Sequence, residues 1–78
     1  MQEILSILKE LRPEFNFEES TDFIEDGFLD SFDIISLVST IEERYSIQID
    51  GLQIVPDNFN SIDAIINLIR ESGGQIEG

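Results

Sequence analysis

The sequence predicts an all-α fold, because its apolar residues recur at helical spacing, and Pro13 and Gly73-Gly74 end the first and last of the periodic stretches. Three stretches have this spacing: residues 2–12, residues 31–45, and a stretch that begins after Asn60 or Ser61. Residues 47–49 alternate briefly, but a lone three-residue strand has nothing to pair with. We therefore expect residues 46–54 to form a loop.

The first predicted helix covers residues 2–12 and is stopped by Pro13. Apolar residues three and four apart form its core-facing side: Ile4, Leu5, Ile7, Leu8 and Leu11. Residues 14–29 follow no helical or alternating period and predict a long loop. Because long loops without structure are uncommon in compact domains, we expect Phe23 and Phe28 to fold this loop back onto the core.

The second predicted helix covers residues 31–45, with Asp30 as its N-cap. One stripe of this helix is apolar and is assigned to the core: Ile34, Leu37, Val38, Ile41 and Tyr45. Pro56 suits the first position of a short third helix of about one turn.

The last predicted helix is capped by Asn60 or Ser61 and ends at Gly73-Gly74. Its apolar residues keep the same spacing: Ile62, Ile65, Ile66 and Ile69. We predict a single domain over residues 1–72 and a flexible tail over residues 73–78.

The chain is strongly acidic, with 17 Asp and Glu residues against four Lys and Arg residues and a formal net charge of −13. Such a charge repels nucleic acid and anionic lipid, and favours partners with basic surfaces. The chain contains no histidine and no cysteine, so the usual acid-base and nucleophilic constellations are missing and we expect no catalysis. No stretch approaches the roughly 20 apolar residues of a membrane span, and we expect a cytoplasmic monomer.

Ser31 stands where the polar loop turns into the second predicted helix. Asp30 precedes it as a good N-cap, and Asp33 follows three positions after the cap. Ser31 should therefore lie in the first helical turn, where free backbone N–H groups and the helix macrodipole favour an anion. A phosphate ester on Ser31 would occupy a favourable position.

The segment Asp30-Ser31-Phe32, with Gly27-Phe28-Leu29 before it and Ile41-Glu42-Glu43-Arg44-Tyr45 after it, resembles the Asp-Ser-Leu signature and following helix of acyl carrier proteins. The resemblance covers nearly the whole chain. It implies a four-helix bundle with a long loop between helices 1 and 2 and a short third helix. It also implies that Ser31 carries a covalent phosphopantetheine arm, whose thiol holds acyl or aminoacyl groups as thioesters for successive enzymes.

The resemblance further implies the partners. A phosphopantetheinyl transferase attaches the arm, and Asp30 matches the aspartate that helps it to place coenzyme A through a magnesium ion. A loading ligase and downstream transferases then dock on the second helix, where Glu42 and Glu43 match acids that meet basic side chains.

Phe32 and Ile35 lie off the core stripe of the second helix, beside Ser31. They predict either a docking surface, which we favour, or packing beneath the preceding loop. The predicted docking surface comprises Phe32, Asp33, Ile35, Ser39, Glu42 and Glu43.

Three positions depart from the acyl carrier pattern: Phe32 replaces the usual leucine, Ser36 a common glutamate, and Arg44 interrupts an acidic run. Asp-Ser-Phe and Glu-Glu-Arg-Tyr-Ser-Ile look more like D-alanyl carrier proteins of cell-envelope teichoic acid modification. Residues 33–36, however, lack the glycine and glutamate of that group. The pattern therefore predicts a specialised acyl or aminoacyl carrier, with the D-alanyl carrier as the alternative.

Two alternatives come from other classes of protein. Five residues fall at positions of an EF-hand calcium loop: Asp22, Asp26, Gly27, Asp30 and Asp33. The third position of that loop, however, is the apolar Ile24, and the twelfth is an aspartate in place of glutamate. We accordingly predict no metal site. An acidic adaptor without a prosthetic group is the other alternative.

Overall fold

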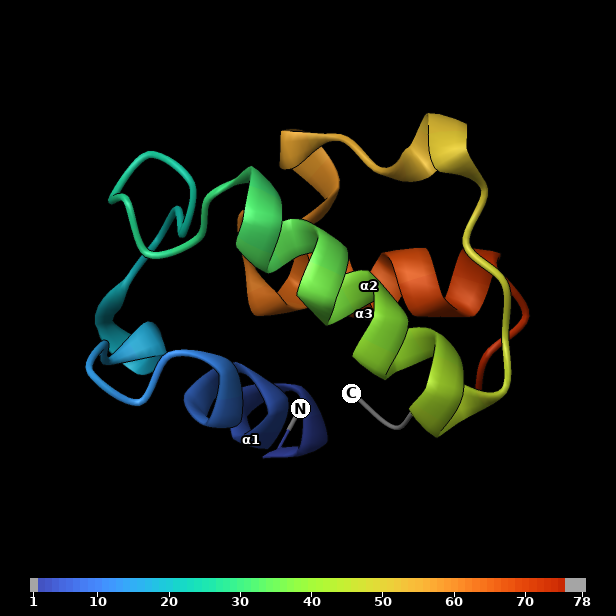
Figure 1. Cartoon of the computed structure of the whole chain (residues 1–78), viewed down its shortest axis with the longest axis horizontal. Coiled ribbons are helices and arrows are strands. Elements are labelled where there is room, and N and C mark those ends of the chain that lie inside the picture. Colours follow the sequence, from blue (N-terminus) through green and yellow to red (C-terminus); the bar gives the residue numbers. More distant parts are fainter. Residues whose placement is uncertain (1, 76–78) are drawn as a thin grey trace.

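The structure is a computed structural model that describes residues 2–75, and this part of the chain is helical without any strand (Figure 1). It contains three α-helices: α1 (Gln2–Leu11), α2 (Ser31–Tyr45) and α3 (Ile62–Glu71). Three single-turn 3-10 helices lie between them: η1 (Phe17–Glu19), η2 (Gly51–Gln53) and η3 (Pro56–Asn58). The predicted all-α class is confirmed.

The expected count of four helices is not confirmed. The segment predicted to hold the short third helix forms only the 3-10 turn η3, with Pro56 at its first position as expected. This turn is closed by the Phe59 N–H donating to the Pro56 carbonyl at 3.0 Å, and φ and ψ at Phe59 then leave the helical region. Phe59 itself is fully buried, so the turn delivers an aromatic side chain to the core.

Side chains and glycines define the ends of α3. Of the two predicted caps, Ser61 is the one used: its hydroxyl accepts from the Ala64 N–H at 3.1 Å. At the other end Gly73 has φ +92°, a left-handed conformation that glycine adopts without steric cost. The Gly73 and Gly74 N–H groups donate to the carbonyls of Arg70 and Ile69 at 3.1 and 2.8 Å. Of the predicted tail, residues 76–78 lie outside the described residues.

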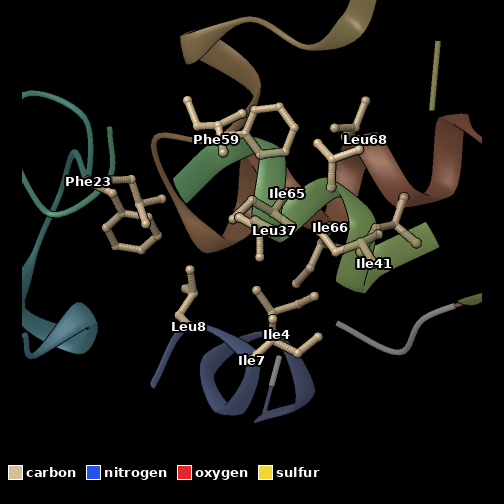
Figure 2. Close-up of a cluster of buried hydrophobic side chains, with 14 of the residues drawn as sticks. Ile4, Ile7, Leu8, Phe23, Leu37, Ile41, Phe59, Ile65, Ile66 and Leu68 are labelled. Carbon is tan, nitrogen blue, oxygen red and sulfur yellow. The ribbon is translucent and has the colours of Figure 1, made fainter. Parts of the chain in front are cut away.

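The core lies where the three helices meet, and Figure 2 shows aliphatic side chains of α1, α2 and α3 pointing into it together with Phe23 and Phe59. The predicted stripe of α2 is buried from Ile34 to Ile41, and Tyr45 is half-buried. Burial of these faces is the main stabilising contribution in a chain of this size.

Aromatic residues close the long loop over one end of the core. Phe23 is buried as expected, whereas Phe28 is half-buried and stacks on Phe15 with ring centroids 4.5 Å apart. Phe17, which the sequence did not single out, is buried and meets Phe23 edge to face at 5.0 Å. The loop that leads to α2 is therefore packed along much of its length.

Polar contacts join α1 and α2 at both ends of the pair. At one end the Tyr45 hydroxyl donates to a Glu3 carboxylate oxygen at 2.5 Å. At the other end Arg12, which follows α1, binds Asp33 in the first turn of α2. The two helices consequently run in opposite directions.

No helix within residues 2–75 is both long enough and apolar enough to cross a membrane.

Candidate functional site

Ser31 is the first residue of α2 and is exposed. It follows the long loop, the teal and green segment that connects α1 to α2 on the left of Figure 1. The chain changes from extended backbone at Asp30, with φ −108° and ψ −175°, to helix at Ser31. A hydroxyl on such a junction is accessible from solvent and is held by regular backbone on its C-terminal side.

A reciprocal capping box fixes this junction. The Asp30 carboxylate accepts from the Asp33 N–H at 2.9 Å, and the Asp33 carboxylate accepts from the Asp30 N–H at 3.2 Å. Ser31 and Phe32 lie between these two residues, where backbone N–H groups of a first turn have no partner within the helix. Together with the helix macrodipole, these N–H groups favour a negative charge beside Ser31.

Arg12 supports the capping box from the end of α1. Its Nε lies 3.1 and 3.0 Å from the two Asp33 carboxylate oxygens, and its Nη2 lies 2.9 Å from Oδ2 of the same residue. The same Nη2 is 3.9 Å from Oδ2 of Asp30, and Nη1 is 3.5 Å from Glu14. One guanidinium therefore sits against both acids that flank Ser31.

Asp33 is a buried carboxylate, with 4% of its surface exposed. Burial alone raises the pKa of its carboxyl, but hydrogen bonds from the Arg12 side chain and the Asp30 N–H, with the charge of Arg12, outweigh it and leave the pKa below its usual value. Asp33 thus stays ionised at neutral pH. Asp33, which the sequence places on the predicted docking surface, has its side chain bonded to Arg12, and it braces the start of α2 from inside.

The other predicted docking residues lie on or near the surface of α2. Phe32 is 74% and Ile35 62% exposed, so neither packs beneath the loop. Ser39 and Glu43 are also exposed. Glu42 is half-buried, and its Oε2 accepts from the Ile49 N–H at 2.9 Å, which ties the following loop to the helix.

The EF-hand arrangement is not formed, because its acids have other partners. Asp22 accepts from the N–H groups of Ile24 and Glu25 at 3.0 and 2.9 Å, while Asp26 accepts from the Ser20 hydroxyl at 2.6 Å. Within residues 2–75 no three acidic side chains are grouped so that they could hold a metal ion.

Comparison with protein families decides the class of this protein. The family model described as a phosphopantetheine attachment site matches residues 2–69. The chain belongs to this family. Membership implies a covalently attached phosphopantetheine group, and it makes the chain a carrier protein.

Two curated relatives are similar to this carrier protein over most of their length. The D-alanyl carrier protein of Bacillus velezensis is 33% identical over 72 residues, which cover 90% of this chain and 92% of the relative. The D-alanyl carrier protein of Bacillus subtilis is 32% identical over 72 residues, with the same coverage.

The start of α2 fits a covalent phosphopantetheine group in this carrier protein. Ser31 offers an exposed hydroxyl, and the first turn of a helix 15 residues long offers free N–H groups beside it. The Asp30 side chain is 66% exposed and can take part in binding a magnesium ion brought by a transferase. Arg12 adds a positive charge beside the two acids of the capping box, Asp30 and Asp33.

Sequence reasoning missed Arg12. Its partner Asp33 is 21 residues away, and nothing in local spacing pairs two residues at that distance. The available signal was a basic residue next to a helix-ending proline, in a chain with only four bases. Two exposed apolar residues of the loop after α2 were also missed, namely Leu52 and Val55.

Proposed function

We propose that Ser31 is the residue to which phosphopantetheine is attached, and that this protein carries acyl or aminoacyl groups for partner enzymes. The observation that supports this most is the exposure of Ser31 at the first position of α2, within the part of the chain that matches the family model. The attached arm ends in a thiol, which forms thioesters with the cargo.

The chain's own residues have separate roles in this proposal. The Ser31 hydroxyl loses its proton and forms the phosphoester bond with the phosphopantetheine part of coenzyme A, while the pyrophosphate bond of coenzyme A breaks and adenosine 3′,5′-bisphosphate leaves. The first-turn N–H groups with the helix macrodipole stabilise the resulting phosphodiester anion. Asp30 helps to bind the magnesium ion that a phosphopantetheinyl transferase uses with coenzyme A. No residue of the carrier acts on the cargo, because chemistry is left to the partners.

We assign docking of those partners to the outer face of α2, formed by the exposed Phe32, Ile35, Ser39 and Glu43 and the half-buried Glu42. Two exposed apolar side chains among acids suit a partner surface that is basic and partly apolar. The net charge of −13 favours fast encounter with such a surface.

Mass spectrometry tests the attachment residue. Incubation with coenzyme A, magnesium and a phosphopantetheinyl transferase should add the mass of one arm to the unaltered chain and nothing to Ser31→Ala. Ser6→Ala is the matched control, because Ser6 is an exposed serine of α1 and should leave the modification intact. An unaltered chain that gains no mass with several transferases would favour the acidic adaptor.

D-alanine is the cargo that the comparisons favour, since both relatives above are D-alanyl carrier proteins. The modified protein should therefore accept D-alanine from a ligase that activates it with ATP, and hydroxylamine should cleave the product as it cleaves a thioester, giving D-alanine hydroxamate and the free thiol of the arm. Loading by a fatty-acyl ligase, with no loading by the D-alanine ligase, would instead assign the protein to fatty acyl transfer.

A further inference from the structure

Arg12 is the only basic residue that the structure places against the first turn of α2 within residues 2–75. Arg12 lies at the other end of the long loop from α2, 21 residues before Asp33 in the sequence. Three of its atom pairs with Asp33 are between 2.9 and 3.1 Å, which is the fork-like geometry of a strong arginine–carboxylate pair.

The contact matters because Asp33 is buried and has two tasks. One carboxylate must receive both the Arg12 guanidinium and the Asp30 N–H. Without the guanidinium, a buried carboxylate would lack its counter-charge, and such a group turns outward or becomes protonated. Either change weakens the bond to the Asp30 N–H and loosens the backbone on both sides of Ser31.

The charges around the first turn of α2 also point to a role for Arg12. The acids closest to the Arg12 guanidinium are Asp30, Asp33 and Glu14. A phosphodiester on Ser31 adds a further negative charge to the same first turn of α2. Arg12 is the cation that balances these charges, in addition to the helix macrodipole.

We propose that Arg12 is a positioning residue for the modification of Ser31, acting through Asp33 to hold the first turn of α2 in the form that the transferase accepts. This inference rests on the proposed attachment at Ser31. We call the first turn of α2 closed when the capping box between Asp30 and Asp33 is formed. Arg12 need not touch the transferase or coenzyme A, because it sets the fraction of chains in which this turn is already closed.

The expected effect is on KM. A transferase that binds only the closed turn sees its affinity for the carrier reduced by the closed fraction, while the bound complex reacts normally. Arg12→Met should therefore raise the KM for the carrier by about tenfold, with kcat changed less than about twofold. Arg12→Lys keeps the charge without the fork and should recover part of the loss.

Tyr45→Phe is the matched control, because it breaks the polar contact at the opposite end of the same helix pair. Rates are measured by mass spectrometry at a temperature where circular dichroism shows every variant to be folded. A loss due to general weakening of the contact between α1 and α2 would appear in Tyr45→Phe as well, whereas we expect its KM to stay within about twofold of the unaltered chain.

A double-mutant cycle tests the route through Asp33. Asp33→Asn should raise the KM about as much as Arg12→Met, and the double variant should be no worse than either, since the two residues act as one unit. Additive losses would mean that Arg12 contacts the transferase directly and would overturn the proposal. An unchanged KM for Arg12→Met, or an equal loss in Tyr45→Phe, would overturn it too.

These outcomes are distinct from failure of the proposed function. If Ser31 is not the attachment residue, Ser31→Ala is modified like the unaltered chain. If only the present inference is wrong, the unaltered chain is modified at Ser31 and Arg12→Met is modified with the same KM. Should Arg12→Met fail to fold, the comparison of Arg12→Lys with Tyr45→Phe still decides the matter.

Discussion

Phe32 and Ile35 show how single residues determine which apolar side chains a helix exposes to solvent. Both lie on α2, yet they are turned away from the core that Ile34, Leu37 and Ile41 enter. Exposing two large apolar side chains is unfavourable in water, so their position beside Ser31 favours contact with a second protein. Because both are already exposed, replacing them should affect binding far more than folding.

We predict that Phe32→Ser or Ile35→Ser raises the KM for the loading ligase about tenfold, which corresponds to loss of one central apolar contact of an interface. Leu52→Ser is the matched control, because Leu52 is 87% exposed but lies on η2. Steady-state loading of the modified protein measures the effect, and melting curves should be unchanged. An unchanged KM in both α2 variants would place docking elsewhere.

For single residues, the sequence predicted which side chains are exposed better than it predicted which side chains bind each other. Ser31 and Phe32 follow from local rules, because the helix start and the phase of the core stripe are encoded by near neighbours. Asp33 shows the limit of those rules. Local spacing places it near the docking face, but a partner 21 residues away draws it inward.

The start of α2 behaves as one element, because the capping box and Arg12 share the Asp33 carboxylate. The pKa of this carboxyl lies below its usual value in the folded protein, as burial is outweighed by the Arg12 and Asp30 interactions. A carboxyl with a lowered pKa stabilises the fold above its unfolded-state pKa. That contribution is lost as the pH falls through the folded-state pKa.

Acid unfolding should reveal this contribution. Asp33→Asn removes the titrating group, so the unaltered chain should melt at a higher temperature than the variant at neutral pH. The gap should shrink as the pH falls below about 4, the ordinary pKa of an aspartate. Melting curves between neutral and acidic pH measure the gap, and Asp63→Asn serves as an exposed control. A gap that stayed constant with pH would mean that the pKa of Asp33 does not change on folding.

Local sequence predicts the long helices of this chain but not its single turns η1 and η2. The periodic stretches predict the C-terminal end of α1 to within one residue and predict both ends of α2 as they are observed, since a continuous apolar stripe encodes a helix. The single turns η1 and η2 carry no stripe. Their position depends on side-chain caps by Asn16 and Asp50 and, for η1, on burial of Phe17, which only the assembled core provides.

The whole molecule combines a small core with a large excess of one charge. A formal net charge of −13 is held within extents of 29 × 24 × 18 Å. These dimensions do not exceed the Debye length of about 30 Å at 0.01 M salt, so the acids repel one another across much of the fold at low ionic strength. The unfolded chain spreads the same charges over a larger volume, and the repulsion therefore destabilises the folded state.

We predict that raising sodium chloride from about 0.01 M to about 0.2 M increases the melting temperature by several degrees, because screening weakens repulsion more than it weakens the few ion pairs. Glu10→Gln with Glu25→Gln removes two exposed charges and should both raise the melting temperature at low salt and reduce the response to salt. Scanning calorimetry at each salt concentration measures both effects. A melting temperature independent of salt would show that the acids lie too far apart to repel one another, and the encounter with basic partners would then owe little to charge.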